Sequence, residues 1–359
     1  MSSMWGNRIK LSIFGESHGP AIGCVLDGIP AGIAIDEEAV LRQMARRAPG
    51  NDATATPRKE SDLPEVLSGI LNGVTTGAPI AAIIRNQNTR SADYEQLRRV
   101  PRPSHADYPA SVRYAGHNDV RGGGHFSGRL TAPIVFAGAI CRQILQARGV
   151  EIGGHILQIE TVRDTAFGDT VTADTCVKLS SASFPLLDPA VEPAMRAAVA
   201  DARAVGDSVG GIVQVAATGL PAGLGNPMFG GVENVLSSLL FGIPAVKGVS
   251  FGSGFDLASM RGSEANDGYR FENGNVTTVT NRNGGILGGL TTGAPLVFNA
   301  VIKPTPSIAM TQPSVDLQTG ENTDLAIQGR HDPCIVPRAV PVLEAACAIA
   351  LLDIWEGTK

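Results

Sequence analysis

The chain has 359 residues, a formal net charge of −5 and 43% hydrophobic residues, which is enough to bury a large core in one or two domains. No apolar run reaches the length of a membrane span, and the first ten residues lack the pattern of a targeting peptide. We therefore expect a cytoplasmic protein that contacts neither membrane nor nucleic acid. Five cysteines without a Cys-x-x-Cys pair argue against a disulfide framework and against a cysteine-based zinc site.

Arginine dominates the cations, with 23 arginines and only six lysines. The planar guanidinium group binds phosphate and carboxylate through paired hydrogen bonds. The bias therefore indicates a strongly anionic small ligand, or else it reflects a GC-rich genome, which the 43 glycines would also fit.

Short apolar runs separated by glycine-rich turns predict a mixed α+β chain rather than a helical bundle. The predicted elements, in chain order, are a strand at 9–14, a helix at 37–47, a strand at 79–85, helices at 132–148 and 190–205, a strand at 211–218, a helix at 232–241, strands at 246–252 and 296–303, and a helix at 340–355.

One eleven-residue segment occurs twice. Residues 69–79 read GILNGVTTGAP and residues 285–295 read GILGGLTTGAP, so nine of eleven positions agree. Chance similarity between two glycine hairpins is the alternative, but identity this dense favours duplication. Because no linker-like segment separates the copies, we predict one domain, 1–359, built from two pseudo-related halves.

Two histidines lie in turn-forming segments. His18 follows Ser17 in the sequence GESHG after a predicted strand, where glycines on both sides would leave it open to a substrate. His105 lies in a proline-bounded loop next to Asp107, which can orient it. Each histidine could be a catalytic acid, and each could equally be an ordinary loop residue.

Three further segments could bind anions or move protons. Arg46 and Arg47 end the first predicted helix, where they could clamp a phosphate or complement the helix dipole. Residues 121–129, RGGGHFSGR, leave backbone amides free just before a predicted helix, but match neither a Walker loop nor a dinucleotide fingerprint. Asp332 stands between Arg330 and Arg338, where it could act as a base or could belong to a capping turn. No residue spacing predicts a metal site.

Together the motifs resemble the chorismate synthase family over nearly the whole chain. The matching segments are residues 15–19 (GESHG), 46–47 (RR), 49–50 (PG), 67–69 (LSG), 105–108 (HADY), 121–124 (RGGG), 219–225 (GLPAGLG), 245–248 (AVKG), 260–264 (MRGSE), 284–289 (GGILGG), 303–307 (KPTPS) and 329–334 (GRHDPC).

The resemblance implies an α+β fold, a β-α-β sandwich with an internal pseudo-symmetric duplication and helices outside antiparallel sheets, assembled as a homotetramer. It implies the 1,4-elimination of phosphate from 5-enolpyruvylshikimate 3-phosphate to give chorismate. The reaction needs reduced FMN but has no net redox change. The flavin would be reduced by the protein itself with NADPH or by an external flavin reductase.

The resemblance also implies roles for individual residues. His18 would act at the departing phosphate, His105 at the reduced flavin, and Asp332 in proton movement, with Ser17 and Ser127 relaying hydrogen bonds. Substrate anions would be bound by Arg46, Arg47, Arg129 and Arg338. FMN would be bound by His125, Phe126, Ser127, Pro244, Ala245, Gly288, Lys303, Pro304, Thr305, Pro306, Ser307 and Arg330.

The chain departs from the common family pattern at a few positions. Alanines occupy positions 48 and 53 where many members have arginine, His125 and Phe126 replace Arg-Ser, and Leu130 replaces glutamate. We interpret these changes as an altered flavin contact rather than as a loss of activity. Two alternatives are a flavin- or phosphate-binding homologue without turnover and a related flavin-dependent phosphate lyase.

Overall fold

The computed structural model describes residues 3–49, 62–86, 95–272, 274–327 and 332–358, and two five-stranded antiparallel sheets dominate it. The first sheet has the order β1-β2-β3-β7-β4, and its strands are β1 (Met4–Trp5), β2 (Lys10–Gly15), β3 (Ala21–Asp27), β7 (Ile80–Arg85) and β4 (Pro64–Ser68). The second has the order β11-β16-β10-β8-β9, and its strands are β11 (Val246–Phe251), β16 (Leu296–Ile302), β10 (Gly211–Thr218), β8 (Glu151–Ile159) and β9 (Val162–Arg163).

Four two-stranded hairpins supplement the sheets. They are β5 (Ile70–Leu71) with β6 (Val74–Thr75), β12 (Tyr269–Glu272) with β13 (Asn275–Thr278), β14 (Ile286–Leu287) with β15 (Leu290–Thr291), and β17 (Gln312–Asp316) with β18 (Glu321–Leu325). The helices are α1 (Glu37–Arg47), α2 (Glu95–Arg99), α3 (Asp107–Arg113), α4 (Thr131–Gln146), α5 (Ala173–Ser181), α6 (Glu192–Ala204), α7 (Val232–Leu240), α8 (Gly262–Ala265) and α9 (Val336–Thr358).

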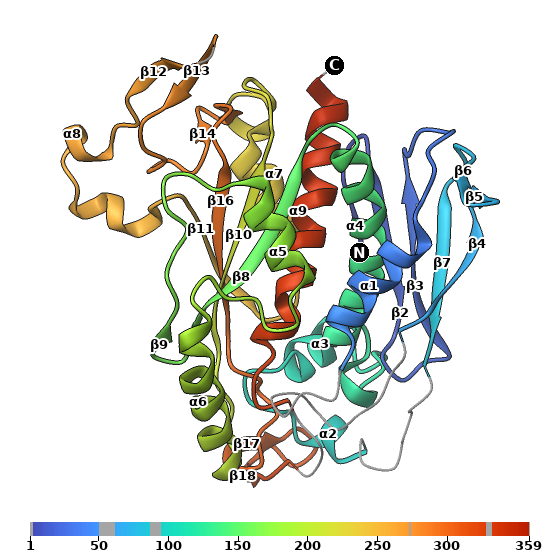
Figure 1. Cartoon of the computed structure of the whole chain (residues 1–359). Coiled ribbons are helices and arrows are strands. Elements are labelled where there is room, and N and C mark those ends of the chain that lie inside the picture. Colours follow the sequence, from blue (N-terminus) through green and yellow to red (C-terminus); the bar gives the residue numbers. More distant parts are fainter. Residues whose placement is uncertain (1–2, 50–61, 87–94, 273, 328–331, 359) are drawn as a thin grey trace.

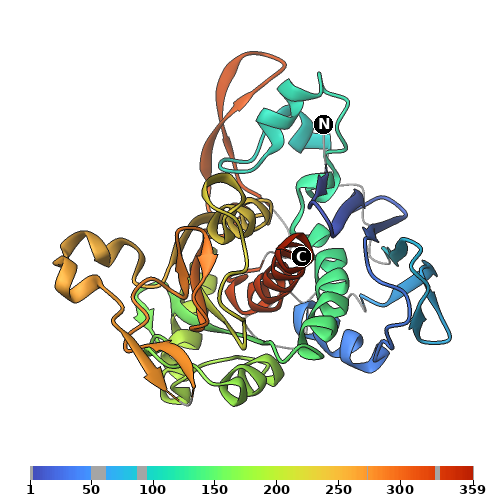
Figure 2. The same ribbon diagram turned by 90° about the horizontal axis from the view of Figure 1, so that it is seen from above.

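The long helices lie between the sheets, as Figures 1 and 2 show. Helix α4 packs on β3 and β7 of the first sheet, α9 packs on β8 and β10 of the second, and the two helices pack on each other. The β-α-β sandwich and the antiparallel sheets are therefore confirmed, but the prediction that the helices lie outside the sheets is wrong for α1, α4 and α9. Helices α4 and α9 are apolar nearly all round, which suits a layer covered on both sides, whereas α1 buries only Val40, Met44 and Arg47.

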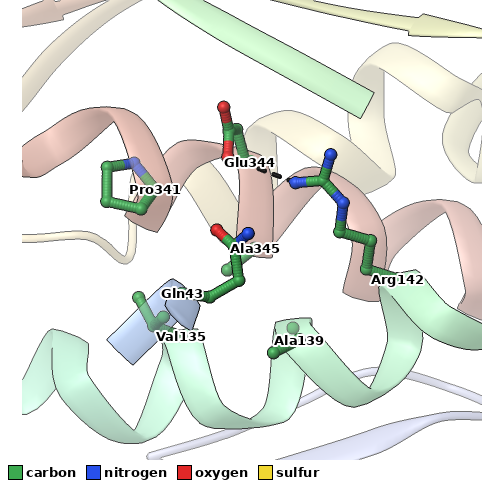
Figure 3. Close-up of a pocket in the computed structure, with 8 residues that line it drawn as sticks. Gln43, Val135, Ala139, Arg142, Pro341, Glu344 and Ala345 are labelled. Carbon is green, nitrogen blue, oxygen red and sulfur yellow. Dashed lines mark hydrogen bonds and ion pairs between the residues drawn. The ribbon is translucent and has the colours of Figure 1, made fainter. Parts of the chain in front are cut away.

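Helices α4 and α9 approach closely because small residues face each other. A Cβ on Gly138 would lie 2.3 Å from the Cβ of Ala345, so no larger residue fits at that position without moving a helix. Figure 3 shows this region, where Val135 and Ala139 of α4 face α9. Close approach of the two backbones brings both sheets onto one continuous core.

Helices cover both faces of the second sheet, whereas among the described residues the helix packed on the first sheet is α4. A Cβ on Gly153 of β8 would strike the backbone of Cys176 in α5, whereas one on Gly154 would lie 3.2 Å from Val340 in α9. Successive strand residues point to opposite faces, so α5 and α9 cover opposite sides. The two glycines also explain why this strand is absent from the sequence prediction, since they interrupt its apolar pattern.

The two halves share one strand order. Strands β2, β3, β7 and β4 adjoin in the same sequence as β8, β10, β16 and β11. The repeated segments form equivalent hairpins, β5–β6 and β14–β15. In each hairpin a threonine hydroxyl donates to a proline carbonyl in an earlier loop, Thr75 to Pro30 and Thr291 to Pro221. Those loops themselves share the pattern Gly-x-Pro-Ala-Gly, at residues 28–32 and 219–223.

Candidate active site

A cavity of about 1650 Å³ lies at one end of the helix layer. It exceeds the usual 300–1,000 Å³ of a small-molecule site, so two ligands could fit together. Most of the residues that the sequence predicted for the site line this cavity, namely His18, Arg47, His105, His125, Phe126, Ser127, Arg129, Pro244, Ala245, Lys303, Thr305, Pro306, Ser307, Asp332 and Arg338. The structure thus brings together segments more than 300 residues apart.

The glycine loop, residues 121–126, supports both predicted catalytic histidines. Gly122, Gly123 and Gly124 all have positive φ angles. A Cβ on Gly122 would lie 2.1 Å from Cε1 of His18, and one on Gly123 would lie 3.1 Å from Nε2 of His105. Bare backbone is therefore required here, because any side chain would displace an imidazole ring.

His18 is held by its neighbour. The hydroxyl of Ser17 donates to the carbonyl of Arg121 at 3.1 Å, and it lies 3.1 Å from Nδ1 of His18. Because the hydroxyl proton is used by that carbonyl, Nδ1 of His18 donates to Ser17. Nε2 is then the ring atom through which His18 can exchange a proton with a ligand. Ser17 itself is 1% exposed and stands behind the histidine rather than in the cavity wall.

His105 is oriented by a buried ion pair. Its Nδ1 lies 2.6 Å from a carboxylate oxygen of Asp107, which also accepts hydrogen bonds from the side chain and backbone of Arg102. Burial by itself would raise the pKa of Asp107, but the hydrogen bonds from Arg102 and His105 hold it well below its usual range. Asp107 therefore stays ionised, and the proton on His105 Nδ1 points towards it.

The same loop is tied to the segment at 303–307. Arg102 donates to Ser307 Oγ at 3.3 Å, and Lys303 Nζ donates to the carbonyl of Ser104 at 2.9 Å. Burial lowers the pKa of Lys303 below its ordinary value, and Lys247 acts in the same direction. The loop that carries His105, predicted to be catalytic, and the segment 303–307, predicted to bind the cofactor, thus form one wall of the cavity.

His125 and Phe126 differ in their freedom to contact a ligand. Nδ1 of His125 donates to the carbonyl of Gly15 at 2.8 Å, and its Nε2 lies 2.7 Å from Ser3 Oγ. Both ring nitrogens are thus engaged within the protein. Phe126 is 37% exposed, and its ring lies 6.2 Å from that of Tyr114. Phe126 is accordingly the better placed of the two to touch a bound ligand.

Three guanidinium groups gather on another wall. Arg338 donates to the backbone carbonyl of Arg47 at 3.0 Å and to Asp332 at 2.7 Å. Arg47 and Arg129 both form ion pairs with Asp62, whose side chain is fully buried. Asp62 could not be predicted from the sequence, because a single aspartate in a polar stretch has no local pattern that marks it.

Two features of the cavity are typical of a ligand-binding site. Thr305 Oγ1 is buried and has no hydrogen-bond partner among the described residues. Ala245 has a φ of 75°, a left-handed conformation that is rare for alanine, and its carbonyl accepts from Lys303 N. Strained backbone and unsatisfied polar atoms concentrate at functional sites.

Besides Ser17, three predicted residues of the described ranges do not line the cavity. Arg46 turns away and binds Glu344 on α9 at 2.5 Å. Gly288 lies in the β14–β15 hairpin, and Pro304 is absent from the cavity wall although its neighbours belong to it. Arg330, like position 53, falls outside the described residues. Within the described ranges, no cluster of three metal-ligating side chains occurs, and no helix has the length and apolarity of a membrane span.

Two antiparallel sheets around a helix layer, with arginines and two histidines lining one cavity, define an α+β enzyme for an anionic ligand. Comparison with known proteins identifies the class. A profile of the chorismate synthase family matches residues 9–355. The chorismate synthases of Thermococcus kodakarensis and Korarchaeum cryptofilum are each 45% identical, covering 99% and 98% of this chain and 99% and 96% of their own. A crystal structure of chorismate synthase superposes with a TM-score of 0.77 at 26% identity, covering 97% of this chain and 92% of the other.

The chain therefore belongs to the chorismate synthase family. It carries the activity of that family, a carbon–oxygen lyase acting on phosphates in the shikimate pathway to the aromatic amino acids. The α+β class with antiparallel sheets and the function implied by the motifs are thus confirmed, whereas the internal duplication and the roles of individual residues stay predictions.

Proposed function

We propose that the cavity converts 5-enolpyruvylshikimate 3-phosphate to chorismate and phosphate by an anti-1,4-elimination. The carbon–oxygen bond to phosphate breaks, the C6–H bond breaks, and a new ring double bond forms, so the overall reaction has no net oxidation. The observation that carries this assignment is that His18 and His105 pack against two consecutive glycines, Gly122 and Gly123. Both histidines line the same cavity as three guanidinium groups.

His18 serves the leaving group in this proposal. With its Nδ1–H fixed on Ser17, His18 in its doubly protonated form donates the Nε2 proton to the phosphate oxygen as the carbon–oxygen bond breaks, and it is left as the neutral imidazole. Arg47, Arg129 and Arg338 neutralise the phosphate and carboxylate charges of the substrate. Arg46 is left out of the clamp, because its guanidinium is bound to Glu344.

Reduced FMN fits the rest of the cavity. The volume admits a second ligand, Thr305 Oγ1 supplies a hydroxyl without another partner, and Phe126 supplies an exposed ring. Together with Ser127, Pro244, Ala245, Lys303, Pro306 and Ser307, these residues would hold the flavin, which supplies electron density to the substrate and takes it back. His105 presents Nε2 to it while Asp107 fixes Nδ1.

Asp332 is the carboxylate available to move the second proton. It lines the cavity, and Arg338 holds it at 2.7 Å. A carboxylate anchored in this way keeps a defined position while one oxygen accepts and passes on a proton. Ser127 lies next to the same wall, where its Oγ accepts from the backbone N–H of Arg129.

Four further properties belong to the proposal. The equal strand order of the two sheets and the equivalent hairpins support an origin by internal duplication. The family resemblance supports a homotetramer in the cytoplasm. Flavin reduction would come from NADPH on this protein or from an external reductase, and NADPH consumption without added reductase distinguishes these sources.

Anaerobic incubation of the protein with reduced FMN and the enolpyruvyl substrate tests the reaction. We expect chorismate and phosphate in equal amounts, with the flavin still reduced at the end. Tight flavin binding without phosphate release would instead indicate a binding homologue. Release of phosphate with a product other than chorismate would indicate a related lyase.

A further inference from the structure

Asp62 binds two arginines that both reach the cavity. One carboxylate oxygen accepts from Arg47 at 2.5 Å, and the other accepts from Arg129. The side chain of Asp62 is fully buried, and the residue itself does not line the cavity. Its φ of 50° places the backbone in the left-handed region just before β4. The carboxylate thus stands behind the two guanidinium groups, on the side away from the ligand.

The remaining contacts of the arginines make this position specific. Arg47 also donates to Thr131 Oγ1 and to the carbonyl of Gly128, both at 3.1 Å, and Arg129 donates to Asn86 Oδ1 at 3.1 Å. These acceptors are neutral. Asp62 is therefore the only full negative charge that the described residues place on either guanidinium within ion-pair distance.

Like charges gathered in a buried wall need such a counter-charge. Burial lowers the pKa of Arg47 to about 10, Arg338 and Arg129 act in the same direction, and Asp62 opposes them. Burial would raise the pKa of Asp62, but Arg47 and Arg129 hold it below its usual range. Among the described side chains of this cluster, three guanidinium groups face two carboxylates, Asp62 and Asp332, so cations outnumber anions.

We propose that Asp62 is a positioning residue of the anion site: it fixes Arg47 and Arg129 side by side and cancels part of their charge, so that both meet the phosphate or carboxylate of the ligand. The inference rests on the proposed function only in taking that ligand to be the substrate. The position of Asp62 behind the arginines makes it a residue that acts through them.

Charge and position predict opposite outcomes when Asp62 is neutralised. Removal of a negative charge alone would strengthen anion binding, because the wall becomes more positive. Loss of the positioning contact would weaken it, because two arginines no longer share a fixed acceptor. Substitution by asparagine, which has the same shape, therefore separates the two effects.

The experiment compares Asp62→Asn with Glu344→Gln in the full chain loaded with FMN. Glu344 is the matched control, since it is a buried carboxylate that binds two guanidinium groups away from the cavity. Inorganic phosphate is titrated by calorimetry, and the KM for the enolpyruvyl substrate is measured. We expect Asp62→Asn to weaken both about tenfold, with FMN affinity unchanged within about twofold, and Glu344→Gln to alter neither.

Unchanged or tighter phosphate binding by folded Asp62→Asn would overturn the inference. If that variant does not fold, Asp62→Glu takes its place, because it keeps the charge but moves it by one methylene, and the same weakening is expected. Phosphate binding needs no turnover. A wild-type protein that fails to make chorismate would therefore contradict the proposed function without deciding the role of Asp62.

Discussion

Two buried carboxylates in this protein each bind two arginines, yet only one of these clusters adjoins the large cavity. The cavity cluster consists of Asp62 with Arg47 and Arg129. The helix-layer cluster consists of Glu344 with Arg46 and Arg142, and part of it is visible in Figure 3. Arg46 and Arg47 are neighbours in the sequence, but they serve different clusters.

The space beside each cluster accounts for its role. The helix-layer cluster adjoins a void of about 10 Å³, room for one water at most, and Glu344 also accepts from the backbone of Gly154. The cavity cluster adjoins the large cavity, which has a volume of about 1650 Å³. The same ionic chemistry therefore stabilises the sandwich in one place and prepares a ligand site in the other. The role of each cluster depends on whether its arginines face a space large enough to bind a further anion.

The largest expected effect concerns the cavity side. His18→Ala removes the proposed proton donor, so kcat should fall about 10²- to 10⁴-fold. The free energy of unfolding should fall by only about 1–2 kcal/mol, because the buried ring loses its contact with Ser17 but also lines the cavity. Steady-state kinetics and urea unfolding measure the two quantities. His117→Ala, an exposed histidine outside the cavity wall, is the control, and full turnover by His18→Ala would refute the acid role.

The next effect concerns the helix layer. Glu344→Ala leaves Arg46 and Arg142 without their buried counter-charge, which should lower the free energy of unfolding by about 3–5 kcal/mol. The KM of the protein that remains folded should not change. Thermal unfolding with and without FMN, together with kinetics at low temperature, checks both expectations. A raised KM with normal stability would place Glu344 in the active site and break the comparison.

Asp107 combines features of the two regions. It is buried like Glu344, but it contacts His105, which lines the cavity. Its folded pKa is depressed, so its ionisation contributes stability above the unfolded pKa, near 4, and this stability is lost as pH falls further. Asp107→Asn should thus lower the free energy of unfolding by about 2 kcal/mol at pH 7 and by much less near pH 2. Its kcat should also fall, because His105 loses its orienting partner.

Urea unfolding of the wild type and Asp107→Asn between pH 7 and pH 2 tests the linkage. Asp316→Asn is the control, since Asp316 also has a lowered pKa but pairs with a half-exposed Arg99. Its effect should be smaller, because solvent screens that pair. A gap between wild type and Asp107→Asn that stays constant across this range would contradict the assignment.

The elements of the fold were largely predictable, because local patterns define them. Helix α1 begins and ends where the sequence predicted, since Asp36 caps its first turn and arginines close its last. Strand β8 was missed at Gly153, where the requirement for glycine comes from Cys176 in another element. Local sequence carries no trace of such a contact.

The site was predictable in its membership but not in its directions. Motifs placed His18, His105 and the arginines in one site, as the cavity does. Adjacent residues on a helix point about 100° apart, so the sequence could not tell which of Arg46 and Arg47 faces the ligand. Asp62 could not be predicted either, because only the folded chain brings it between Arg47 and Arg129.

Substitution by lysine at Arg46 and at Arg47 should give the smallest changes in stability and KM. It compares two neighbouring arginines that belong to different clusters. Lysine keeps the charge but loses the planar fork that binds two acceptors. Arg46→Lys should lower the free energy of unfolding by about 1 kcal/mol and leave the KM unchanged, whereas Arg47→Lys should raise the KM several-fold.

The pH dependence of Arg47→Lys gives this comparison a second readout. Burial lowers the pKa of Arg47 to about 10, so arginine stays charged throughout the neutral range. The same burial would lower the pKa of a lysine at this position below its usual value of about 10.4, so that it would lose charge at a lower pH than arginine does. The KM of Arg47→Lys should therefore rise further between pH 7 and pH 9, while that of Arg46→Lys follows the wild type. Parallel KM profiles for the two variants would show that both arginines serve stability alone.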